Sequence, residues 1–183
     1  MQKWTKYFGI ITQIISSINK ISLCTNLIKF FSALGKVIKT KAIVISTLKY
    51  QDKSLIVKCF TQSDGLKSYF VANAFSAKKS QQKIGYFQPL NLLEIEATHK
   101  NKGTLEYFKE LKMANVYQTI ATDVVKSTIV LFLSEILHHS IHEEEKNEPL
   151  FHFLETAFLW LDTHAEVSNF HLIFLLELTK FLG

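Results

Sequence analysis

The hydrophobic period of the chain changes once, near residue 115, and this change limits the folds that the sequence can adopt. Before it, between residues 39 and 113, β-branched and aromatic residues crowd short runs that polar segments separate, as in strands. After Tyr117, apolar residues recur at spacings of three and four, which indicates amphipathic helices. The sequence therefore predicts an α+β chain in which a sheet precedes a group of helices.

The first part of the sequence predicts five strands. We expect them at about residues 39–50, 54–61, 66–73, 88–97 and 104–113. Gln51 to Lys53 and Ser63 to Gly65 have turn chemistry, Gly103 suits the positive φ of a hairpin bulge, and Pro89 lies near a strand start. Five strands with a long connection between the third and the fourth match the order of an OB-fold barrel.

Alternation along the second strand assigns its side chains to two faces of the sheet. One face carries Leu55, Val57 and Cys59, and the other carries Ile56, Lys58 and Phe60. We expect the first face to be buried inside a curved sheet and the second to be partly polar.

The second part of the sequence predicts three helices. The first should span about residues 122–142, the second should start with Asn147 as N-cap and Pro149 in its first turn, and the third should begin near residue 168. The apolar stripes expected to be buried are Val125, Ile129, Phe132, Leu133, Ile136 and Leu137 on the first helix, Leu150, Phe151, Leu154, Phe158 and Leu161 on the second, and Phe170, Ile173, Phe174 and Leu178 on the third.

Charge is distributed unevenly along the chain. Residues 1–37 carry a net charge of +5, residues 38–115 of +7 and residues 116–183 of −7, within a total of +5. All 21 basic residues are lysines, which bind phosphate as point charges and lack the rigid fork that arginine uses to read guanine. We therefore expect the strand-rich part to contact nucleic acid without sequence preference.

The expected DNA contacts follow from the position of the lysines in this barrel. Lys49 and Lys53 flank the first hairpin, and Lys100 and Lys102 lie in the last hairpin. OB-folds bind oligonucleotides with the loops at these two positions. The residues that we expect to contact DNA are Lys41, Lys49, Lys53, Lys67, Tyr69, Lys78, Lys79, Lys83, Lys100 and Lys102. Four tyrosines either stack on bases or fill the core of the barrel: Tyr50, Tyr69, Tyr86 and Tyr107.

Signals for catalysis, metal binding and membrane insertion are weak. The sequence shows no catalytic group of a nucleophile, a general base and a residue that orients the base, and it has no Gly-rich phosphate-binding loop. We therefore expect that the protein is not an enzyme and binds no cofactor. Cys24 and Cys59 are too few for a zinc site, and His138 and His142 share a helical face without a third ligand, so we expect no metal. The longest apolar stretch, residues 170–182, contains charged residues and is too short for a membrane span. A reducing cytoplasm fits the two cysteines best.

Residues 1–36 contain no acidic residue and are rich in Ile, Ser and Lys. This composition leaves two interpretations open, a targeting or membrane-surface helix and an appended or mis-assigned leader. We expect neither to carry the function.

Three segments together resemble the bacterial RecO family of recombination mediators over residues 38–183. They read KTKAIVISTLKYQDKSLIVKCFTQSDGLKSYFV, FQPLNLLEIEATHKNKGTLEYFKELKMA and NFHLIFLLELTKFLG. The resemblance implies an OB-fold domain at residues 38–115 and a helical domain at residues 116–183. It also implies binding of single- and double-stranded DNA, annealing of complementary strands, and partnership with RecR. Through RecR and the tail of single-stranded-DNA-binding protein, such a protein helps to load RecA on gaps, at the nucleoid.

The chain departs from the family pattern at both ends. The resemblance implies a start near Val37, so residues 1–37 read as a leader or a mis-assigned extension. It also implies further helices beyond Gly183 and, in some members, a cysteine-bound zinc for which this sequence has no ligands. We therefore expect an incomplete helical domain. The alternative from another class is a protein-interaction scaffold in which the barrel is only structural.

Overall fold

The computed structural model describes residues 36–75, 84–100, 105–142 and 145–182. Apart from Lys36, the strands and helices below belong to one compact unit, residues 37–99 and 103–183. The predicted leader lies outside the described residues except for Lys36 and Val37. Among the helices that are described, none combines the length and the apolar character that crossing a membrane requires.

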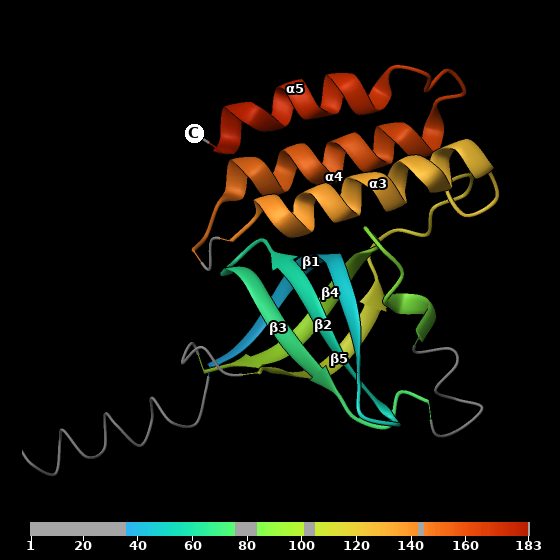
Figure 1. The fold of residues 1–183 in the computed structure, drawn as a ribbon. Helices are drawn as coiled ribbons and strands as arrows, with labels where there is room; N and C mark the ends of the chain where they lie inside the picture. The colour runs from blue at the N-terminus through green and yellow to red at the C-terminus, as the bar shows by residue number, and fades with distance from the viewer. Residues whose placement is uncertain (1–35, 76–83, 101–104, 143–144, 183) are drawn as a thin grey trace, which may run out of the picture. The chain divides into compact units, whose positions relative to one another are not determined.

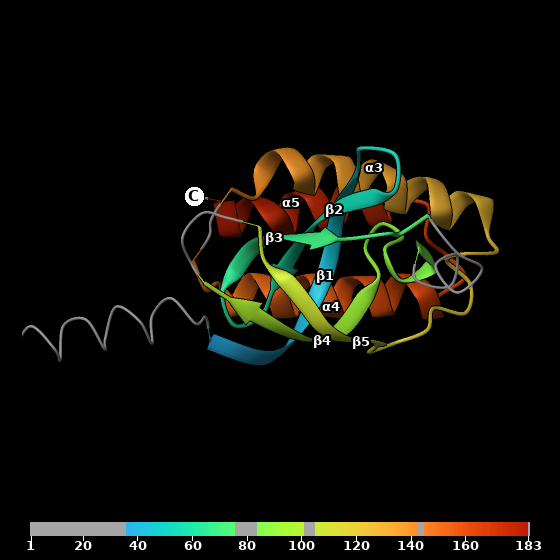
Figure 2. The same cartoon turned by 90° about the horizontal axis from the view of Figure 1, so that it is seen from below.

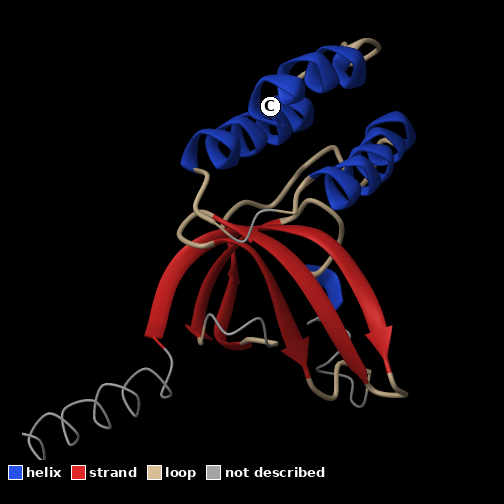
Figure 3. Ribbon diagram, turned by 60° about the vertical axis from the view of Figure 1, so that its left-hand side comes forward, coloured by secondary structure: helices blue, strands red, loops and turns tan. Residues whose placement is uncertain are grey.

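Five strands form the first part of the fold, as predicted (Figure 1). They are β1 (Lys36–Tyr50), β2 (Ser54–Thr61), β3 (Gly65–Val71), β4 (Leu92–His99) and β5 (Tyr107–Met113). Their order in the sheet is β3-β2-β1-β4-β5. A parallel bridge joins β3 to the start of β5, where the Phe70 N–H donates to the Glu106 carbonyl at 2.9 Å and the Glu106 N–H donates to the Ser68 carbonyl at 2.8 Å. The curved sheet of Figure 3 is thus closed in the manner of an OB-fold.

Three helices follow the barrel and pack against one side of it (Figures 1 and 2). They are α3 (Val124–Ser140), α4 (Glu148–Thr163) and α5 (Phe170–Leu182). Asp123 caps α3 by accepting hydrogen bonds from the backbone of Val125 and Lys126. Asn147 caps α4 as predicted, because its Oδ1 accepts from the Leu150 N–H at 3.1 Å. The predicted α+β class, an OB-fold barrel followed by helices, is confirmed.

Strand register sorts the side chains of β1, β2 and β3 into rows across the sheet. The outward rows are Ile43–Phe60–Leu66, Ser46–Lys58–Ser68 and Leu48–Ile56–Phe70. The first row packs into the same apolar core as the helices, which explains why Phe60 is fully buried although it faces outward. The second and third rows are at least partly exposed. The predicted inner face of β2 is confirmed, since its three apolar residues line the core of the barrel.

Two expectations about element boundaries and faces were wrong. β4 begins at Leu92 rather than at residue 88, because Leu90 adopts a positive φ of 60° and the Asn91 N–H turns back to the Gln88 carbonyl. Three residues predicted to be buried on helices are instead largely exposed: Val125 (57%), Phe132 (45%) and Ile173 (61%). On α5 only Phe174 and Leu178 are buried. These helices therefore carry apolar side chains that the core does not bury.

Candidate nucleic-acid interface

The β1–β2 hairpin carries two exposed lysines at the end of the barrel away from the helices (Figure 1). Gln51 turns the chain with a positive φ of 54°, so Lys49 and Lys53 lie on either side of a tight turn. Neither lysine has an ion-pair partner among the residues that the structure describes. The Lys49 Nζ lies 5.7 Å from the ring centroid of Phe75, a cation–π contact that leaves its charge uncompensated. The hairpin tip therefore offers free positive charge to a polyanion.

An exposed row of aromatic rings lies beside this hairpin, and we call Tyr50, Phe70 and Tyr107 the aromatic row. The ring centroids of Tyr50 and Phe70 are 6.0 Å apart and those of Phe70 and Tyr107 are 6.1 Å apart, both edge to face. Tyr50 is 42% exposed and Tyr107 is 50% exposed. The row therefore crosses the outer surface of β1, β3 and β5.

Lys109 adds a third exposed cation near the row. The register of β4 with β5 passes from Glu96 opposite Glu110 to Ala97 opposite Phe108, so Lys109 is the extra residue of a β-bulge. It lies two residues from Tyr107 and is exposed. Along the chain, Lys109 thus lies close to the Tyr107 end of the row and Lys53 close to the Tyr50 end. Lys49 lies opposite Leu55 of the barrel core, so its side chain starts from the other face of β1 than Tyr50 does.

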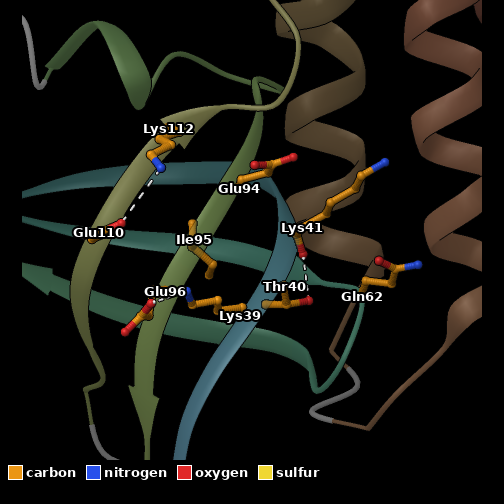
Figure 4. A pocket seen from close by; sticks show the side chains of 9 residues that line it. All are labelled: Lys39, Thr40, Lys41, Gln62, Glu94, Ile95, Glu96, Glu110 and Lys112. Carbon is orange, nitrogen blue, oxygen red and sulfur yellow. Dashed lines mark hydrogen bonds and ion pairs between the residues drawn. The ribbon is translucent and has the colours of Figure 1, made fainter.

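The side of the barrel formed by β1, β4 and β5 has a different character. A groove of about 420 Å³ is lined there by lysines and glutamates together (Figure 4). Lys39 pairs with Glu96 at 3.1 Å, and the Lys112 Nζ lies 3.9 Å from Glu110. Because carboxylates compensate its lysines, this groove has no strong attraction for phosphate.

Three residues expected to contact DNA are used elsewhere in the fold. Lys41 forms an ion pair with Glu155 of α4 at 2.6 Å and so joins the barrel to the helices. Lys67 lies opposite Cys59 on the inner side of β3 and is only 9% exposed. Tyr69 is fully buried in the barrel core. Their burial or pairing makes these three residues weaker candidates for DNA contact than the exposed lysines of the hairpin.

Tyr69 belongs to a buried polar chain. Its hydroxyl lies 2.6 Å from His99 Nε2, and His99 Nδ1 lies 3.0 Å from Asp64 Oδ2. The Tyr69 ring also stacks on Phe108 with centroids 4.1 Å apart. Burial raises the pKa of the Tyr69 hydroxyl, so the residue stays neutral. Burial by itself would also raise the pKa of Asp64, but hydrogen bonds from Ser63 and His99 hold that pKa below its ordinary value.

The remaining predicted contacts fall into two groups. Lys100 follows β4 directly and is exposed. Four lysines lie outside the described residues: Lys78, Lys79, Lys83 and Lys102. Among the candidate stacking tyrosines, Tyr86 is half-buried against the barrel core, while Tyr50 and Tyr107 are exposed. Sequence reasoning missed Phe70 and Lys109, although alternation from Tyr69 would have placed Phe70 on the outer face.

Within the described part of the chain, no three His, Cys, Asp or Glu side chains are arranged to hold a metal ion. His138 of α3 is half-buried. Burial and the nearby charge of Lys58 lower its pKa below the ordinary value. His139 is exposed instead, and its Nε2 lies 3.0 Å from Glu135 Oε1 on the same helix.

Comparison with known proteins identifies both parts of the fold. Residues 36–117 match the family described as recombination protein O N terminal, and residues 121–183 match recombination protein O C terminal. The chain is 74% identical over 146 residues to the DNA repair protein RecO of Flavobacterium psychrophilum, which covers 80% of this chain and 61% of the relative. The corresponding protein of Flavobacterium johnsoniae is also 74% identical, over 62% of its length. That of Christiangramia forsetii is 49% identical.

The chain spans about three fifths of the length of these curated relatives. The two family matches nevertheless cover the barrel and all three described helices. On these matches the chain belongs to the RecO family.

Proposed function

We propose that this chain binds single- and double-stranded DNA through the hairpin end of its barrel and promotes the annealing of complementary strands. The observation that carries the proposal is the pair of exposed, uncompensated lysines on the β1–β2 hairpin of an OB-fold. Lys109, an exposed residue of β5, adds to the positive charge of the barrel. The relatives of this chain are named DNA repair proteins, which agrees with such a role.

The mechanism is binding without covalent chemistry. Lysines that neutralise the phosphates of two strands release counterions and reduce the repulsion that slows their pairing. Since lysine contacts phosphates without reading bases, this surface serves any pair of complementary sequences. Residues 38–115 thus act as the DNA-binding domain of a repair and recombination mediator.

The helical residues 116–183 are the proposed partner-binding domain. As in the family, the partners are RecR and the tail of single-stranded-DNA-binding protein, and the outcome is the loading of RecA on gaps in the cytoplasm, at the nucleoid. A protein-interaction scaffold remains the second candidate, because α5 exposes Leu172 (54%), Ile173 (61%) and Leu176 (70%). Absence of DNA binding by the whole chain, together with binding of a protein partner, would favour the scaffold.

The test is fluorescence anisotropy of a labelled single strand of about 30 nucleotides across a salt series. The variant Lys49→Ala/Lys53→Ala should bind more weakly and should lower the slope of log K against log salt by about 1.4, because each phosphate contact contributes about 0.7. The matched control is Lys39→Ala/Lys112→Ala, which removes two lysines that carboxylates already compensate. Equal slopes for both variants would contradict the assignment of the interface.

A further inference from the structure

The aromatic row places two tyrosine rings on a surface where apolar groups have no structural task. Tyr50 and Tyr107 are about half exposed, and the third outward row of the sheet continues the same surface with Leu48, which is 64% exposed. The helices pack over the first outward row, Ile43–Phe60–Leu66, and do not cover the third outward row. Exposed rings grouped in this way are typical of a binding site.

Phe70 fixes the orientation of both tyrosines. It is half-buried, and its ring plane makes angles of 82° with Tyr50 and 73° with Tyr107, so each tyrosine meets it edge to face. The backbone hydrogen bonds between Phe70 and Glu106 hold β3 against the residue that precedes Tyr107. The two tyrosine rings are therefore held by strand pairing before any ligand binds, which lowers the entropic cost of binding.

The charges around the row favour a nucleic-acid strand over a protein partner. Lys53 lies in the turn that follows Tyr50, and Lys109 follows Tyr107 in β5. Lys49 precedes Tyr50 and lies opposite Leu55, so its side chain starts from the other face of β1, at the tip of the same hairpin. Exposed rings flanked by lysines are the combination with which OB-folds bind single strands, since bases stack on the rings while the lysines follow the phosphates. Bases in a duplex are stacked on each other and are not available to such rings.

We propose that Tyr50 and Tyr107 stack on unpaired bases, with Phe70 as a positioning residue, and that this makes the hairpin face selective for single strands. The inference rests on the proposed DNA binding and deepens it. The lysines bind the backbone of single strands and duplexes alike, whereas the tyrosines add affinity only where bases are free. An annealing site of this kind holds unpaired strands and releases the duplex that forms from them.

The experiment compares three DNA ligands with the whole chain by fluorescence anisotropy: a single strand, the same backbone with abasic sites, and a duplex. The variant Tyr50→Ala/Tyr107→Ala should weaken binding of the base-bearing single strand by roughly 25-fold, from about fivefold for each lost stack. Binding of the abasic strand and of the duplex should stay within about twofold of wild type, because the lysines are intact. Phe132→Ala removes a comparably exposed ring on α3 and serves as the matched control.

Two further variants keep the result interpretable. Tyr50→Phe/Tyr107→Phe retains the rings and should bind as the wild type does, and a loss of affinity there would assign the effect to the hydroxyls and overturn the inference. Tyr50→Leu/Tyr107→Leu retains apolar volume without a ring and should lose single-strand affinity. Equal losses for all three ligands, or no loss for any, would also overturn it. Failure of the wild type to bind any of them would refute the proposed function itself.

Discussion

Asp162 connects α4 to the segment that follows the barrel, and its removal should lower the stability of the whole fold. The carboxylate of this residue, which is 5% exposed, accepts three backbone hydrogen bonds. The donors are the N–H groups of Gln118 at 2.9 Å, Thr119 at 2.8 Å and Ile120 at 3.1 Å. The Thr119 hydroxyl donates to the Asp162 carbonyl, which also accepts from the buried Lys126 at 3.1 Å. One side chain thus fixes the path between the two parts of the fold.

The magnitude follows from these contacts. A hydrogen bond to a charged group contributes about 1.5 kcal/mol or more to stability. In Asp162→Ala the exposed Gln118 can bond to water instead, whereas Ile120, which is 7% exposed, keeps an unsatisfied N–H. We therefore expect a loss of about 3 kcal/mol in the free energy of unfolding. For a chain of this size that corresponds to a fall in Tm of roughly 6–12 °C.

The assay is urea denaturation followed by circular dichroism, with Glu166→Ala as control, because Glu166 is an exposed acid of the same helical region. The control should change the free energy of unfolding by less than about 0.5 kcal/mol. A loss below about 1 kcal/mol for Asp162→Ala would refute the reasoning from the three hydrogen bonds.

The same residue predicts a dependence on pH. Burial by itself would raise the pKa of Asp162, but the backbone donors outweigh it and hold the pKa below the ordinary value. A carboxyl with a lowered pKa stabilises the fold above its unfolded pKa of about 3.9 and loses this contribution as the pH falls through the folded pKa. The difference in stability between the wild type and Asp162→Ala should therefore be constant near neutral pH and shrink in acid.

Two further predictions concern the buried residues of β2. Phe60→Ala should lower the free energy of unfolding, measured by urea denaturation, by about 3–5 kcal/mol. The reason is that Phe60 is fully buried beneath the helices and packs on Phe151 with ring centroids 6.2 Å apart. A loss under about 1 kcal/mol would show that the helices do not pack on this row. Cys59 should resist thiol reagents in the native state and react on unfolding, because it is fully buried and burial raises the pKa of its thiol. The measurement uses a Cys24→Ser variant, in which Cys59 is the remaining thiol, and rapid labelling of this native protein would contradict the position of Cys59 in the barrel core.

Local patterns in the sequence determined much of the fold correctly. Alternation along β2 assigned Leu55, Val57 and Cys59 to the barrel core, because residues two apart on a strand share a face. Asn147 was identified as an N-cap because its side chain needs only a backbone N–H three residues further on. Such features depend on neighbours close in sequence.

The candidate site was harder to predict because its residues are distant in sequence. The pairing of Lys41 with Glu155 spans 114 positions, and no local pattern indicates it. Lys67 was a different case. It alternates with Tyr69 and Val71, so the pattern placed it on the inner face, but its charge suggested the surface. Where periodicity and residue type disagreed on this strand, periodicity was right.

Acidic residues, more than lysines, decide which face of the barrel is available to DNA. Thirteen lysines lie between residues 38 and 115, yet those on β1 and β5 next to β4 are compensated by glutamates. Glu96 and Glu110 lie directly opposite each other, an arrangement of like charges that destabilises a sheet unless cations offset it. Lys39, which is held by Glu96, provides that offset and is thereby withdrawn from phosphate binding. Free positive charge therefore remains at the β1–β2 hairpin and the β5 bulge, the two places that flank the aromatic row.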